Sequence, residues 1–220
     1  MQLSILSFQQ EQSAIVPDLR FSVTEAAHYI MALNFQQEFE LLYVDFTAKP
    51  NGNGMVGLKL IRDARQTMHP KIYDHLALIN ISSVCAATIY KHGKEKVRNE
   101  KNNFPVDATM MVTEGCMDDY QRFKKHLLPV SRQFLLRPVH TQWNTILKAF
   151  DYFLMDGVWE AVLFTAGLIV KYKKSGGISH AQLLDGLSDK DFYPILCASM
   201  ENFLAQRYPL DKKALMMPEQ

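Results

Sequence analysis

The clearest pattern of hydrophobic positions in this chain lies between Thr141 and Leu187. In its first part the apolar residues recur every three or four positions, which is the spacing of one helical face; they are Trp143, Ile146, Leu147, Phe150, Phe153 and Leu154. From Val158 to Val170 they are no longer confined to one stripe, which predicts a helix buried on most sides. Asp156-Gly157 and Gly176-Gly177 provide the breaks, because glycine adopts the left-handed conformation in which many helices end, and Ser179 can cap the next helix. The segment therefore predicts three consecutive helices at the centre of a helical domain.

The N-terminal part predicts two more helices. The sequence Ser22 to Glu25 has the form of a capping box, in which the serine and the glutamate each accept a free backbone N–H. Behind it a helical face of apolar residues continues to about Phe46. The glycine-rich stretch from Lys49 to Gly54 predicts a surface turn. We expect a helix from Met55 to Gln66, although its first residues also resemble a short strand.

The middle and the end of the chain complete an all-α prediction. Pro70 starts a short helix, and Ser82 or Ser83 can cap a second one that ends near Tyr90. A long helix is expected to begin at Thr113 and to bend at Pro129; its predicted buried stripe is Tyr120, Phe123, Leu127, Val130 and Phe134. Asp191 opens the last helix, with Pro194 tolerated in its first turn; its predicted buried face is Ile195, Leu196, Ser199 and Phe203. We predict about eight or nine helices in one domain over residues 1–220, with a loose tail at 209–220.

A charged segment separates the two halves of this pattern. Residues 91–103 contain five basic and two acidic side chains and no sustained apolar face. Such a composition predicts a solvated surface loop, and the alternative is a patch on which a partner docks.

Composition excludes several classes of protein. The chain has 220 residues, 48% of them hydrophobic, 21% charged, and a net charge of +1, which gives no general electrostatic reason to bind nucleic acid or an anionic membrane. Three widely separated cysteines lack the spacing of a metal site and predict buried free thiols in a reducing compartment; they are Cys85, Cys116 and Cys197. The N-terminus has no basic residues of a signal peptide, and the longest apolar run, Val158 to Val170, is shorter than the ~20 residues that cross a bilayer. A cytoplasmic protein without cofactor or metal is the expectation.

The C-terminal third also resembles a known family. A tryptophan, a helix ending in an aromatic-Asp-x-Phe-Leu-x-x-Gly phrase, an apolar helix and a short Leu-Leu helix are similar to the C-terminal lobe of TBC domains. Here the phrase runs from Phe150 to Gly157, with Phe150 where the family has tryptophan. The pattern of Pro70, His75 and Leu76 is similar to a phrase that precedes this lobe, but a charged segment and a further long helix intervene, either as an insertion or because the match is accidental. The resemblance implies an all-helical module that binds Rab-type small GTPases in vesicle traffic.

The same resemblance implies what catalysis would need. TBC domains supply an arginine in an Ile-x-x-Asp-x-x-Arg phrase and a glutamine in a Tyr-x-Gln phrase, and this chain has neither. In Ile15 to Arg20 the arginine stands one residue early, which turns a side chain by ~100° on a helix, so Arg20 is only a weak catalytic candidate. Gln36 and Gln37 fit an exposed helical face, as do Arg62 and Arg65.

Other catalytic templates are absent from the sequence. There is no phosphate-binding glycine loop, no nucleophile elbow and no paired histidines at metal-ligand spacing. His126, beside two lysines, is expected to face solvent, as are the adjacent Asp118 and Asp119. Trp143, Asp151 and Gly157 are interpreted as structural, with Asp151 at the border of the apolar face accepting hydrogen bonds from a neighbouring helix N-terminus. The sequence thus predicts a small-GTPase-binding module without fingers of its own, and the alternative is a helical scaffold or adaptor with no GTPase role.

Overall fold

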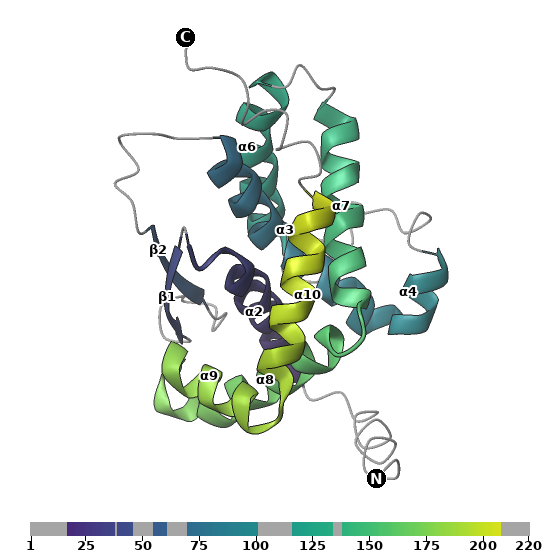
Figure 1. The fold of residues 1–220 in the computed structure, drawn as a ribbon. Coiled ribbons are helices and arrows are strands. Elements are labelled where there is room, and N and C mark those ends of the chain that lie inside the picture. Colours follow the sequence, from purple (N-terminus) through teal and green to yellow (C-terminus); the bar gives the residue numbers. More distant parts are fainter. Residues whose placement is uncertain are drawn as a thin grey trace.

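A computed structural model describes residues 17–37, 39–45, 55–60, 70–100, 116–133 and 138–207. Eight α-helices and one small sheet make up these residues, so the predicted all-α class and helix number are confirmed for the described part of the chain. Figure 1 shows α2 and α3 in the middle, the strands on one side and the short helix α4 on the opposite side. The expected tail at 209–220 lies outside the described residues, as do Arg62 and Arg65.

The helix α2 (Pro17–Ala32) forms the centre of the core. Every residue from Ser22 to Ala32 is buried, because α3, α8 and the strands β1 and β2 pack against the helix. The 3-10 turn η1 (Leu33–Phe35) continues it. The predicted capping box at Ser22 is wrong, because the helix already begins at Pro17. Proline fits the first turn of a helix because a backbone N–H at that position would have no partner within the helix.

The second core helix, α3 (Pro70–His92), is one continuous helix of 23 residues, so the two short helices predicted there are wrong. The serines expected to cap the second helix instead bond back within the turn: Ser82 Oγ donates to the Ile79 carbonyl at 2.6 Å and Ser83 Oγ to the Asn80 carbonyl at 3.2 Å. Such local bonds satisfy buried hydroxyls without ending a helix. The part from Ile72 to His92 is long and apolar enough to cross a bilayer. However, 83% of its apolar stretch is buried inside the protein, as in a core helix.

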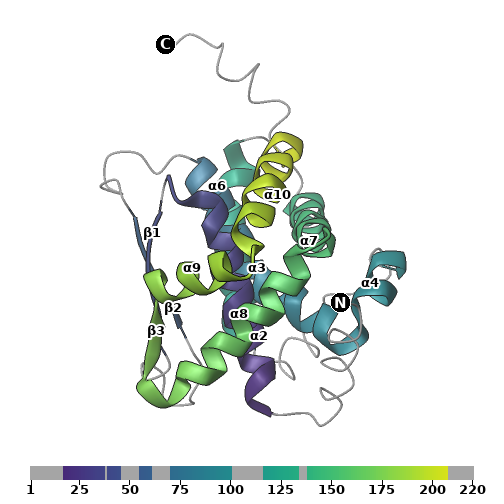
Figure 2. The same cartoon turned by 60° about the horizontal axis from the view of Figure 1, so that its bottom comes forward.

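The largest correction to the sequence prediction is a three-stranded antiparallel sheet in the order β2-β1-β3. The strands are β1 (Phe39–Asp45), β2 (Met55–Leu60) and β3 (Gly177–Ser179). Helices were expected at both β1 and β2. In β1, buried Phe39 and Leu41 flank exposed Glu40, which is the period of a strand half covered by a core. Figure 2 shows β3 at the edge of this sheet, just before α9, where it pairs with β1 from far along the sequence.

The remaining helices follow the predicted order. They are α6 (Met117–Gln133), α7 (Pro138–Leu154), α8 (Val158–Tyr172), α9 (His180–Asp189) and α10 (Phe192–Arg207), with the 3-10 turn η3 (Lys173–Ser175) after α8. Glycine breaks are confirmed at Gly157 and Gly176, with φ of 81° and 88°. In the last helix Leu196, Ser199 and Phe203 are buried as predicted, but Ile195 is 39% exposed, so its predicted burial is wrong.

The charged segment is helical where the structure describes it. Residues 91 and 92 end α3, Gly93 makes a turn at φ 87°, and α4 (Lys94–Glu100) follows. The predicted loop at 91–103 is therefore wrong for residues 91–100, and residues 101–103 lie outside the described part. α4 has no apolar face because only one of its side chains, Val97, is buried. Its charged side chains make its other contacts with the protein.

Candidate functional site

Within the TBC-like phrase, the turn between α7 and α8 is the part whose backbone departs from helical geometry. Gly157 is left-handed, and a Cβ at this position would come within 2.6 Å of Ile195 Cγ2. Its N–H donates to Glu160 Oε2 at 3.0 Å, so the carboxylate satisfies one of the free donors at the start of α8. The negative charge also lies at the positive end of the helix dipole, which stabilises the start of α8.

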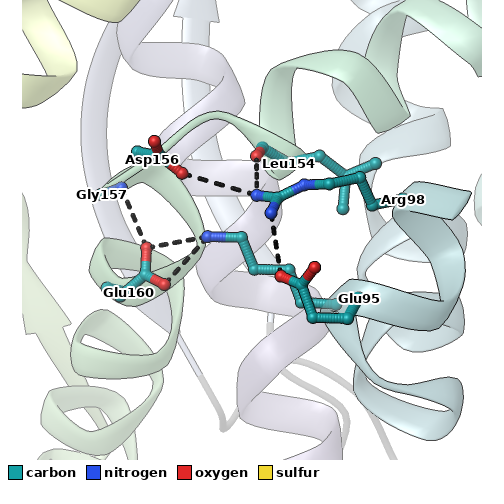
Figure 3. A network of polar contacts seen from close by, with 7 residues as sticks. Glu95, Arg98, Leu154, Asp156, Gly157 and Glu160 are labelled. Carbon is teal, nitrogen blue, oxygen red and sulfur yellow. Dashed lines mark hydrogen bonds and ion pairs between the residues drawn. The ribbon is translucent and has the colours of Figure 1, made fainter.

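Two cations of α4 contact residues at this turn, and Figure 3 shows one of them, Arg98, beside Leu154 and Asp156. Lys94 Nζ lies 2.9 Å and 3.3 Å from the two carboxylate oxygens of Glu160. Arg98 Nη2 donates to the Leu154 carbonyl at 3.0 Å and lies 3.5 Å from Asp156 Oδ1, while its Nη1 lies 2.9 Å from Glu95. A cation on one of the last carbonyls of α7 complements the negative end of that helix. The charged segment thus joins the end of one helix to the start of the next.

These contacts change the electrostatic interpretation of the charged segment. Lys94 and Arg98 each face a carboxylate of the same protein, and the Lys94 side chain is only 16% exposed. Of the basic residues within α4, Lys96 is the remaining one and is exposed, in a helix that also carries the exposed Glu95 and Glu100. A strongly basic docking patch on α4, the alternative raised by the sequence, is therefore not supported by the charges of α4 itself.

The predicted structural residues occupy different parts of this region. Gly157 is in the turn, Trp143 is partly buried against the core on α7, and Asp151 is half-buried on the same helix. The role of Asp151 as an acceptor for a helix N-terminus stays a prediction. Arg20 lies far along the chain on α2, half-buried, with its guanidinium carbon 5.9 Å from the centre of the Phe21 ring. A finger has to project from the surface into a partner, and the catalytic role of Arg20 stays a weak prediction.

A buried imidazole between two carboxylates was missed by the sequence analysis. His28 Nδ1 lies 3.4 Å from Glu25 Oε2 on α2, and its Nε2 lies 3.6 Å from Asp119 Oδ2 on α6. All three side chains are largely buried, so the expectation that Asp119 faces solvent is wrong, whereas Asp118 is exposed as predicted. The spacing of Glu25 and His28 is an ordinary helical i,i+3 pair, and only the tertiary fold adds Asp119.

A second polar cluster lies between α2, α9 and α10. Tyr29 Oη is 2.9 Å from His180 Nδ1, and burial raises the pKa of Tyr29, with the nearby Tyr193 adding to the shift. Burial and the Cys197 thiol raise the pKa of Tyr193. Burial lowers the pKa of His180, which favours the neutral ring. Tyrosines held protonated and a neutral histidine can form a fixed hydrogen-bonded network, and neither tyrosine is poised to ionise near neutral pH.

The cysteines and histidines of the described residues form no metal site. Among these residues no group of three or more His, Cys, Asp or Glu side chains could hold a metal ion. The three cysteines are free thiols, as predicted; Cys85 and Cys116 are buried, but Cys197 is only half-buried. Burial, followed by the charge of Cys116, raises the pKa of the Cys85 thiol, which disfavours the thiolate that a nucleophile or metal ligand requires.

No family model matches this chain, and no protein of the curated collections is significantly similar to it in sequence.

Proposed function

We propose that this chain is a binding module for a folded protein partner, that the partner belongs to the Rab-type small GTPases, and that the module supplies no catalytic finger. The α7–α8 unit is the observation that carries the proposal. The TBC-like phrase from Phe150 to Gly157 folds as the end of a helix, a left-handed glycine turn and the start of an apolar helix. This is the arrangement that the resemblance leads one to expect for these residues. Arg20, the one candidate finger, is a half-buried residue of α2.

A scaffold or adaptor without a GTPase partner is the second candidate, and the sheet favours it. TBC domains are all-helical, whereas here β1, β2 and β3 form a sheet whose strands β1 and β2 contact α2. Two of its strands, β1 and β2, lie between α2 and α3 in the sequence, and the third, β3, follows α8. Both candidates are binding proteins, so the identity of the partner separates them.

A pull-down against a panel of small GTPases tests the proposal. The immobilised full chain is offered each GTPase loaded with GDP or with a non-hydrolysable GTP analogue. Retention of one or more Rab-type proteins, stronger in one nucleotide state, supports the proposal, because a specific partner contacts the segments that change with the nucleotide. Equal absence of retention for all Rab proteins would refute it and leave the adaptor role.

A pair of charge variants locates the contact. Asp156 is 99% exposed beside the α7–α8 turn, and Asp185 is an exposed residue of α9 near the sheet. If the partner docks at the turn, Asp156→Lys should weaken binding, while the matched Asp185→Lys should leave it unchanged. Equal effects of the two variants would place the docking surface elsewhere.

A further inference from the structure

Within the described residues, the short helix α4 is attached to the rest of the protein by a few identified contacts. Of its seven side chains only Val97 is buried. Its other anchors are polar: Lys94 on Glu160, and Arg98 on the Leu154 carbonyl and Asp156. Arg98 is 39% and Asp156 99% exposed, and an ion pair with such exposure contributes little to stability, so the less exposed pair of Lys94 and Glu160 is the main ionic anchor.

The connection between α3 and α4 has the geometry of a hinge. Gly93 sits at φ 87°, where residues with a Cβ are strained, and no atom of the described residues lies within 4 Å of the position a Cβ would take. Its N–H still donates to the Ile89 carbonyl at 2.8 Å, and its carbonyl accepts from Val97 N–H at 3.1 Å. The backbone on both sides of Gly93 is thus helical and hydrogen-bonded, while the space around Gly93 is open. Rotation at this residue can move α4 as a unit without breaking α3.

We propose that α4 is a latch that opens about Gly93 while the core of the protein stays folded. In the closed state Lys94 and Arg98 bridge the end of α7 and the start of α8. Opening takes Val97 out of its contact, frees the Leu154 carbonyl, and leaves Glu160 on the Gly157 N–H alone. Segments held by one buried apolar side chain and a few polar contacts open locally, well below the free energy of global unfolding. The latch does not depend on the identity of any partner.

Amide hydrogen exchange of the full chain tests the latch. The reporter amides are those of Val97 to Glu100, the part of α4 that can form helical hydrogen bonds. Lys94→Met keeps most of the side-chain volume and removes the charge that faces Glu160. We expect these amides to exchange about three- to tenfold faster in this variant, with the amides of α2, α3 and α8 unchanged. The matched control is Lys96→Met, on the same helix but exposed, which should leave exchange in α4 unchanged.

Two further variants separate the ionic contact from the hinge. Glu160→Gln removes the charge but keeps an oxygen that can accept from Gly157 N–H, so α8 keeps its first turn while α4 exchanges faster. In Gly93→Ala the added Cβ would meet no atom of the described residues, but the backbone at this φ is strained for alanine. The variant should therefore also speed amide exchange in α4. Raising the salt toward ~1 M should accelerate exchange in the unmodified protein more than in Glu160→Gln, because screening acts on the charge pair.

The results that would overturn the latch are specific. Equal exchange rates in Lys94→Met and Lys96→Met would show that the bridge to Glu160 does not hold α4 closed. A parallel acceleration in α3 and α8 would show that α4 opens only together with the core. Insensitivity of the unmodified protein to salt would contradict the ionic part of the closure.

Discussion

Gly157 combines two constraints at one residue. Its φ of 81° strains any residue that carries a Cβ, and that Cβ would lie 2.6 Å from Ile195 Cγ2. We therefore expect Gly157→Val to lower the free energy of unfolding by about 1–2 kcal/mol or more, because a β-branched residue meets both the backbone strain and the contact. Denaturation by urea should show this loss as a lower midpoint with an unchanged slope.

A second glycine provides a control in which the substitution should raise, not lower, the free energy of unfolding. Gly167 is an exposed residue within α8, and a Cβ there would meet no atom within 4 Å. Gly167→Ala should raise the midpoint, by up to about 1 kcal/mol in stability, because alanine favours the helix. If Gly157→Val leaves the midpoint where it was, the turn in solution is not left-handed at this residue.

His126 predicts a pH dependence of stability. Asn80 Nδ2 lies 3.2 Å from its Nδ1, and since an amide N–H only donates, Nδ1 has to accept and stay unprotonated. Burial, with the charges of Lys125 and Arg122, lowers the pKa of His126, so the unfolded chain takes up this proton more readily. The contribution to stability is present above the unfolded pKa of about 6.5 and is lost as the pH falls below it.

Urea midpoints at pH 7.5 and 5.5 measure this effect. His126→Gln keeps an amide that can meet Asn80 but cannot be protonated, so the drop in midpoint between the two pH values should be smaller in the variant. Burial also lowers the pKa of His180, which the variant retains, so part of the drop in urea midpoint should remain. An equal or larger drop in His126→Gln would show that the ring is not held neutral by its surroundings.

These residues illustrate which side-chain roles the sequence could predict. The left-handed turn at Gly157 was predictable because glycine after an apolar stripe is a local signal. The surroundings of His126 were not, because Asn80 lies on another helix far along the chain, and the solvent-facing position expected for His126 is wrong: it is half-buried. The same limit applies to Asp119 opposite His28.

At the scale of elements, α9 has the most complete N-terminal cap. Ser179 Oγ accepts from Gln182 N–H at 3.3 Å, and the Gln182 side chain accepts from Ser179 N–H at 3.0 Å. Ser179→Ala should destabilise the protein by about 0.5–2 kcal/mol, since a free N–H of the first turn loses its acceptor, whereas Ser179→Asp should cost little. Thermal unfolding of the two variants side by side provides the measurement. Equal losses would show that the cap contributes nothing beyond the side chain's size.

The elements that the sequence predicted wrongly share one cause. β1 and β2 consist of short apolar runs whose period cannot separate strand from buried helix, and their pairing with each other and with β3 decides for the strand. In α3 the serines suggested a cap, but within a buried helix their hydroxyls bond to the preceding turn instead. In α4 the absence of an apolar stripe suggested a loop, while ion pairs with distant residues hold the helix. Each outcome depends on partners that local patterns do not contain.

At the scale of the whole molecule, the missing fingers lead to a kinetic expectation. The chain should not accelerate GTP hydrolysis by any Rab-type GTPase, because an arginine finger contributes roughly 10³–10⁵-fold and the sequence contains neither finger phrase of the TBC family. Single-turnover hydrolysis with and without excess protein is the measurement. A rise above about tenfold that disappears in Arg20→Ala would contradict this expectation and make Arg20 a finger after all.

The architecture as a whole was predictable in class but not in arrangement. The apolar stripes of α7 and α8 predicted helices at the centre of an all-α core, and both helices are indeed largely buried. The burial of α2 from Ser22 to Ala32 on every side was not predictable, because it results from α3, α8 and the sheet closing around it. Which helices meet is a property of the tertiary fold.

The order of the helices along the chain has a consequence during synthesis. The two most enclosed helices, α2 and α3, leave the ribosome before α8, which packs on α2, and before α7, which packs on α3. At ~5–20 residues per second, the stretch from His92 to Tyr172 takes roughly 4–16 s to make. For that time the nascent chain presents an apolar helix that is long enough to be mistaken for a membrane anchor. Newly made protein should therefore depend on chaperones that shield such helices until the C-terminal third arrives.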